Sequence, residues 1–168
     1  PNGKKLVITD TPFKELKKHK KDLATFEEAL DFINKKTLLY VEIKPGVAVE
    51  PIVKVIKKYL KKGWQPTNFL IASFSQDVLL TTHRELPEVE KVVLENWSAI
   101  RARRRAHQVD TKRVSMNQKW LWGGFISAMA LGGWKVYAYT LNNPKKAKKW
   151  KKRGLYGTIT DFPDRFKH

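Results

Sequence analysis

An acidic and a basic side chain stand two residues apart at the end of a short apolar run, Leu38-Leu39-Tyr40-Val41-Glu42-Ile43-Lys44. Successive side chains of a strand point to opposite faces, so Glu42 and Lys44 share one face and the other face is purely apolar. The apolar face suits packing against helices, and the mixed face is therefore expected to point inward. There a divalent metal ion and a phosphate group would satisfy both charges. A local Glu42–Lys44 salt bridge is the alternative that spacing alone leaves open.

Polar and aromatic side chains also stand at the carboxyl ends of later apolar runs. Ser73 and Phe74 end the second run, and Asn142 and Asp161 follow the last two. In parallel α/β sheets the carboxyl ends of the strands meet at one rim, where functional sites are built. Each residue alone has an ordinary loop or helix-cap explanation. Their joint position at one rim favours a single site.

The elements that must position these residues alternate between strand and helix patterns. A capping box, Thr25-Phe26-Glu27-Glu28, opens one helix, and Asn143, Pro144 and Gly154 bracket another. This alternation is typical of βα units around a parallel sheet. We predict a less regular stretch over residues 96–110. We predict strands over residues 38–44, 69–74, 89–95, 113–117, 135–141 and 156–161.

The composition is that of a single domain over residues 1–168. With 168 residues and 42% hydrophobic content, the chain is long enough to bury a core. The absence of cysteine excludes disulfides, zinc–thiolate sites and thiol nucleophiles. No apolar run approaches the roughly 20 residues that span a bilayer. A cytoplasmic location is the default expectation.

A formal net charge of +18 makes nucleic acid, anionic membranes and anionic substrates candidate partners. Most lysines lie on predicted helix faces, as in a solvated surface, and this distribution argues against nucleic acid. A tighter cluster of Arg101, Arg103, Arg104 and Arg105 suits phosphate better than lysines do. A surface anion site at this cluster is one interpretation, and a solvated surface is the other.

Five motifs follow one another along the chain: Thr25-Phe26-Glu27-Glu28-Ala29-Leu30 at a helix start, Val41-Glu42-Ile43-Lys44, Ala72-Ser73-Phe74-Ser75, Val136-Tyr137-Ala138-Tyr139-Thr140-Leu141-Asn142 and Gly157-Thr158-Ile159-Thr160-Asp161-Phe162-Pro163. In this order and at these spacings they resemble the glycerophosphodiester phosphodiesterase family, from about residue 9 to residue 166. The resemblance implies a TIM (βα)8 barrel that hydrolyses glycerophosphodiesters to glycerol phosphate and an alcohol, with Mg²⁺ or Ca²⁺ as cofactor.

The resemblance also implies roles for individual residues. Glu42 falls on a metal-ligand carboxylate, and Lys44 falls on the catalytic cation that faces the phosphate. Tyr139 stands where the family usually has tryptophan. The positions implied to contact substrate are Ser73, Phe74, Tyr139 and Asn142.

Several motifs of the family would precede Pro1: a His-Arg-Gly strand, a Glu-x-Asp metal pair and a His-Asp strand. The expectation is therefore an incomplete barrel, the C-terminal part of the enzyme, inactive alone and lacking both catalytic histidines. Three early strands and six here make nine. For that reason we expect either 89–95 or 113–117 to lie outside the barrel.

The expected partners are a glycerophosphodiester substrate and either the missing N-terminal segment or a second copy of the chain. Peripheral membrane contact stays open. The alternative function is a non-catalytic basic module that binds nucleic acid or an anionic membrane. Metal-dependent hydrolysis would support the enzyme, whereas steeply salt-dependent binding without hydrolysis would support the module.

Overall fold

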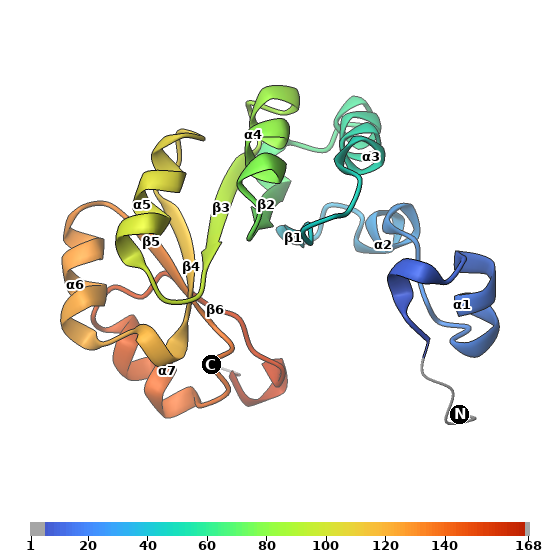
Figure 1. Ribbon diagram of the computed structural model, residues 1–168. Helices are drawn as coiled ribbons and strands as arrows, with labels where there is room; N and C mark the ends of the chain where they lie inside the picture. Colours follow the sequence, from blue (N-terminus) through green and yellow to red (C-terminus); the bar gives the residue numbers. More distant parts are fainter. Residues whose placement is uncertain (1–5, 167–168) are drawn as a thin grey trace. The chain divides into compact units, whose positions relative to one another are not determined.

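The computed structural model describes residues 6–166, which belong to two compact units, Pro1–Thr37 and Leu38–His168 (Figure 1). In the first unit, the predicted capping box is confirmed, because the Thr25 hydroxyl accepts from the Glu28 amide and the Glu28 carboxylate accepts from the Thr25 amide. Left-handed backbone at Asn34 then ends the helix. The elements of this unit are η1 (Ile8–Asp10), α1 (Phe13–His19) and α2 (Phe26–Ile33).

The second unit is built on one parallel sheet of six strands, each paired with the next along the chain. A doubly wound sheet reverses its strand order at a switch point, whereas a TIM barrel keeps it sequential. The observed order is thus that of a (βα)8 barrel with six of its eight strands. These strands are β1 (Leu39–Glu42), β2 (Phe69–Ser73), β3 (Glu90–Glu95), β4 (Arg113–Asn117), β5 (Lys135–Tyr139) and β6 (Gly157–Thr158).

Helices link successive strands along the outer side of the curved row of strands (Figure 1). The prediction of an irregular stretch over residues 96–110 was wrong, because most of it is a helix. Ser98 caps that helix by accepting from the Arg101 amide, and small side chains at Ala102 and Ala106 bury its inner face. The helices and 3-10 turns are α3 (Val49–Lys61), η2 (Pro66–Asn68), α4 (Gln76–Glu85), α5 (Ala99–His107), η3 (Gln118–Trp120), α6 (Gly123–Leu131), α7 (Pro144–Lys151) and η4 (Pro163–Phe166).

All six predicted strands lie in the sheet, so the expectation that one would lie outside the barrel was wrong. The two strands in question, β3 and β4, pair with each other and each with one further neighbour. They are also the central strands: all of β3 except Glu90 is buried, and so are the three middle residues of β4. The last strand is shorter than predicted, although the Ile159 amide still donates to the Ala138 carbonyl beyond its end. An eight-stranded barrel therefore needs two further strands.

The two faces of the sheet carry two different apolar cores. The larger core lies under the helices and joins the sheet residues Val93, Val114 and Val136 to helix residues such as Ile126 and Trp150. The smaller core lies on the opposite face, the barrel interior. It consists of Leu70, Ala72, Val92, Leu94 and Tyr137, with Tyr40 and Phe74 packed against it. The predicted inward face of the first strand is confirmed, since Tyr40 packs on the interior core and Glu42 shares its side of the strand.

The free edges of β1 and β6 lead to the first prediction. Among residues 6–166, each of these two strands pairs on one side only. Unpaired edges of apolar parallel strands recruit other strands. The 168-residue chain purified alone is therefore expected to self-associate, and adding a polypeptide that bears the two remaining strands is expected to restore a single closed species. Light scattering with and without the added polypeptide measures this. A cooperatively melting monomer with exchange-protected amides in β1 and β6 would contradict it.

Candidate functional site

The first part of the candidate site is the pair of charges at the carboxyl end of β1. Lys44 Nζ lies 2.6 Å from Glu42 Oε1, so the local salt bridge that spacing left open is formed. Both side chains reach solvent at the rim. The Glu42 charge also acts across the interior: burial raises the pKa of Tyr139, and the negative charges of Glu95 and Glu42 raise it further. Glu42 therefore faces the interior, where a ligand could meet it.

Two aromatic side chains form a wall of the interior near these charges. Phe74 and Tyr139 meet edge to face, with their ring centroids 5.9 Å apart and their planes at 90°. The Tyr139 hydroxyl lies 2.8 Å from the Glu95 carbonyl oxygen and 3.0 Å from Asn96 Oδ1. Because its pKa is raised, the hydroxyl stays protonated and acts as a donor. The structure thus brings these two predicted residues together at one wall.

Ser73 is placed differently from its neighbour Phe74. Its hydroxyl is fully buried, donates to the Ile43 carbonyl at 2.7 Å and accepts from the Ser75 amide at 3.0 Å. These bonds tie the end of β1 to the end of β2. A direct contact between Ser73 and substrate stays a prediction.

Asn142 joins the ends of the last two strands. Its Nδ2 donates to Asp161 Oδ2 at 2.9 Å, and its Oδ1 accepts from Thr160 Oγ1 and from the Asp161 amide. Asn142 and Asp161 therefore lie together at the rim, as their shared position at strand ends predicted. A substrate contact by Asn142 stays a prediction, since its side chain already bonds to protein on both of its polar atoms.

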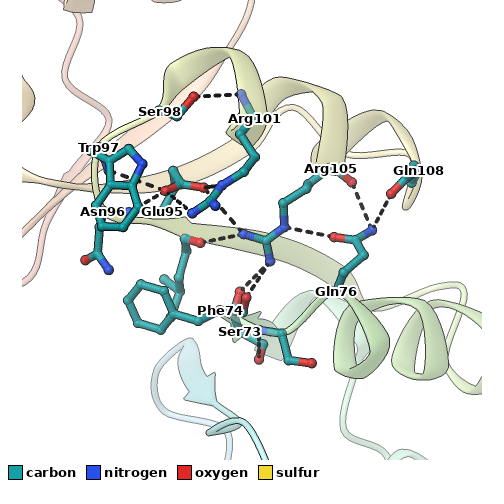
Figure 2. Close-up of polar contacts among 12 residues, drawn as sticks. Ser73, Phe74, Gln76, Glu95, Asn96, Trp97, Ser98, Arg101, Arg105 and Gln108 are labelled. Carbon is teal, nitrogen blue, oxygen red and sulfur yellow. Dashed lines mark hydrogen bonds and ion pairs between the residues drawn. The ribbon is translucent and has the colours of Figure 1, made fainter.

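The sequence analysis missed a carboxylate at the end of β3, Glu95, whose side chain has no solvent exposure. Figure 2 shows it between Arg101 and Arg105 of α5. Arg101 binds it with two nitrogens, Nε at 2.6 Å and Nη2 at 2.8 Å. Burial alone would raise the pKa of Glu95, but the Arg101 hydrogen bonds and the amides of Trp97 and Asn96 lower it below its usual value. Glu95 is therefore an ionised, fully compensated carboxylate.

Arg105 connects the ends of β2 and β3. It donates to the carbonyls of Leu94 and Phe74, each at 2.9 Å, and to Gln76 Oε1 at 3.0 Å (Figure 2). Its Nη1 also lies 3.8 Å from Glu95 Oε2. We name the set Glu95, Arg101 and Arg105 the rim clamp. Arg101 and Arg105 are one helical turn apart, and that spacing was the available signal that both face the same side of a helix.

The four clustered arginines consequently do not share one surface. Arg101 and Arg105 belong to the rim clamp, Arg103 lies over the Trp134 ring at 5.4 Å, and Arg104 is exposed. A surface anion site made by all four arginines therefore does not form in this structure.

Residues 6–166 contain no group of three or more histidine, aspartate or glutamate side chains placed to hold a metal ion. Glu42 could supply one oxygen ligand, and hard divalent cations require several. The described residues could therefore supply only part of a metal site. Within the same range, no helix combines the length and the apolar character needed to cross a membrane.

Comparison with known proteins gives a consistent result. Residues 3–165 match the model of the Glycerophosphoryl diester phosphodiesterase family. A glycerophosphodiester phosphodiesterase of Bacillus subtilis (strain 168) is 27% identical over an alignment of 152 residues that covers 84% of this chain and 52% of that protein. The chain spans about half the length of this curated relative.

Solved structures share the fold. A phosphodiesterase of Oleispira antarctica, in complex with the product sn-glycerol-3-phosphate, superposes with a TM-score of 0.73 at 25% identity, covering 84% of this chain and 59% of that one. The glycerophosphodiester phosphodiesterase of Thermotoga maritima superposes with a TM-score of 0.71 at 19% identity, covering 98% of this chain and 72% of that one. The predicted α/β barrel, incomplete in this chain, is confirmed.

The rim clamp generates the second prediction. Replacing Arg105 with methionine, Arg105→Met, removes a nearly buried cation from Glu95 and leaves the Phe74 and Leu94 carbonyls without their donor. The loss is expected to lower the free energy of unfolding by about 3 kcal/mol. Arg104→Met, at an exposed position on the same helix, is the control, with an expected change within about 0.5 kcal/mol. Urea denaturation measures both, and equal midpoints for the two variants would contradict the role of Arg105.

Proposed function

Because the chain belongs to the glycerophosphoryl diester phosphodiesterase family, we propose that it forms the C-terminal part of a barrel that hydrolyses glycerophosphodiesters to glycerol phosphate and an alcohol. The observation that carries the proposal is the position of Glu42 and Lys44, at the carboxyl end of β1 and near the aromatic wall of Phe74 and Tyr139. The bound sn-glycerol-3-phosphate of the Oleispira antarctica structure supports a small phosphate ester as the ligand.

Lys44 is proposed to stabilise the negative charge that builds up on the phosphoryl oxygens. Among residues 6–166, Lys44 is the only cation paired with Glu42. Its side chain is mostly exposed, so it can reorient toward a ligand at the rim. A preorganised positive charge is worth most where charge develops in the transition state. If Lys44 exchanged its ion pair with Glu42 for one with a phosphate oxygen, its positive charge would stay paired during the reaction.

Glu42 is proposed to supply one ligand for Mg²⁺ or Ca²⁺, both of which prefer carboxylate oxygens. When bound, the ion would polarise the phosphoryl oxygens. Because no group of three or more potential metal ligands comes together among residues 6–166, the remaining ligands would come from outside the described residues. Hydrolysis is therefore assigned to the barrel completed by two further strands.

The aromatic wall is proposed to receive the glycerol part of the substrate. The Tyr139 hydroxyl is occupied by acceptors from the end of β3, so the residue offers its ring to the ligand. The Phe74 ring meets it at a right angle, and Arg105 fixes the Phe74 backbone from behind. An aromatic wall beside a charged rim suits a ligand with a carbon backbone at one end and a phosphate at the other.

The metal assignment is tested in the complete protein with Glu42→Gln. The substitution keeps the size of the side chain and removes its charge, so the divalent ion should bind more weakly and turnover should fall by about 100-fold or more. Glu50→Gln, at an exposed position in α3, is the control with unchanged kinetics. Hydrolysis of glycerophosphocholine across a metal titration is the measurement. Wild-type activity of Glu42→Gln at limiting metal would remove Glu42 from the ligand set.

The role of Lys44 is tested separately with Lys44→Met. Loss of a charge aimed at the transition state should lower kcat by about 100-fold while the melting temperature stays close to that of the wild type. Lys54→Met, an exposed lysine in α3, provides the matched control. An unchanged kcat for Lys44→Met would show that its salt bridge to Glu42 is only structural.

A further inference from the structure

The six tryptophans of the chain fall into two equal groups. Three are at least 94% buried in the second unit: Trp64, Trp134 and Trp150. The other three expose 59%, 56% and 63% of their surface, in the order Trp97, Trp120 and Trp122. Exposing one large ring is common, whereas exposing three in one region marks an interaction surface.

The exposed tryptophans lie at one end of the sheet. Trp97 follows β3, and Trp120 and Trp122 lie between β4 and α6. Because β3 and β4 are neighbouring parallel strands, these two loops lie side by side at the carboxyl rim. Phe162, which follows β6, is also exposed at this rim. Among the large aromatic side chains exposed in residues 38–166, only Tyr156 lies before a strand, at the opposite end of the sheet.

The rings are held in place from within the rim. Arg101, fixed by its two bonds to Glu95, lies over the Trp97 ring at 5.3 Å, and Trp97 stands beside it in Figure 2. The rings of Trp122 and Phe125 are 5.3 Å apart. A ring that is already ordered loses little conformational entropy when a partner covers it.

Cationic side chains lie beside these rings. Lys119 is exposed next to Trp120, and Arg165 lies over the Phe162 ring at 3.9 Å. Lys44 is exposed at the end of β1 on the same rim. Tryptophan among lysine and arginine is the composition that proteins use at the boundary between lipid and water, where cations attract anionic headgroups.

We propose that this rim surface docks onto membranes that contain anionic lipids. It is defined by Trp97, Trp120, Trp122, Phe162, Lys119 and Arg165. Docking would set the mouth of the barrel against the headgroups, so that phosphodiesters of the membrane surface reach Glu42 and Lys44. That last step rests on the proposed function, whereas docking itself does not.

Aliphatic side chains beside the rim favour lipid over nucleic acid as the occupant. Val47, which follows β1, and Ile100, in the first turn of α5, expose 39% and 85% of their surface. Bases stack on aromatic and guanidinium planes, and branched aliphatic side chains offer them no such plane. The interfacial region of a bilayer accepts aromatic and aliphatic side chains alike.

The test uses the full translation product of the gene and vesicles of phosphatidylcholine, alone or mixed with phosphatidylglycerol. Flotation should recover the protein only with the anionic vesicles. The triple variant Trp97→Ala, Trp120→Ala, Trp122→Ala should bind at least about tenfold more weakly, and so should Lys119→Gln with Arg165→Gln. Circular dichroism confirms that each variant is folded.

Matched controls lie at the opposite end of the sheet. Tyr156→Ala removes an exposed ring there, and Lys112→Gln with Lys135→Gln removes two cations. Both should bind vesicles within about twofold of the wild type, since neither side chain set touches the docked surface. If the control pair loses as much binding as the rim pair, net charge drives the attraction and the proposal is overturned.

A measurement on the unaltered protein is independent of the variants. Brominated phosphatidylcholine in the anionic vesicles should quench part of the tryptophan fluorescence, because the rim rings insert and the buried ones do not. No quenching, or retention on single-stranded oligonucleotides without vesicle binding, would overturn the proposal. Hydrolysis of soluble glycerophosphocholine should be unchanged in the rim variants. Vesicle binding without any hydrolysis in the wild type would refute the proposed function and leave the docking surface intact.

Discussion

The rim depends on one buried negative charge, the carboxylate of Glu95. A carboxylate removed from water is costly unless it is paired and fully hydrogen-bonded, so Arg101 and Arg105 must both turn inward from α5. Once placed, Arg105 also holds the carbonyl of Phe74, and the backbone of Glu95 accepts from Tyr139. The residues that neutralise this single charge therefore also connect the aromatic wall to α5.

Patterns that are local in the sequence predicted the architecture well. Period-two alternation placed Tyr40 and Glu42 on the interior face, and the packing of Tyr40 on the interior core confirms it. Cap chemistry predicted the ends of helices: Asn143 accepts from the Lys146 amide at the start of α7, and Gly154 adopts φ +97° just past its end. Each of these signals acts within a few residues, which is why the sequence alone reveals it.

Features that depend on distant residues could not be predicted in the same way. Arginines dominate α5, and its buried residues are only Ala102 and Ala106, so no large apolar side chain marks its inner face. The bond from the Ser73 hydroxyl to the Ile43 carbonyl links residues 30 apart in the sequence, and no local pattern reveals it. Counting one strand for each family motif gave nine, whereas all six strands here join one sheet and leave room for only two more in an eight-stranded barrel.

The position of the charged pair at the edge of the sheet links chemistry to closure. Two hydrogen bonds join the end of β1 to β2: the Ile43 amide donates to the Ala72 carbonyl, and the Ser73 hydroxyl donates to the Ile43 carbonyl. No strand among residues 6–166 constrains it from the other side. Glu42 and Lys44 consequently stand where a further strand would dock, and a carboxylate at a strand junction can share an ion with ligands from both neighbours. By this argument, a strand that pairs with the free edge of β1 would also bring further ligands to Glu42. Without that strand, Glu42 and Lys44 neutralise each other.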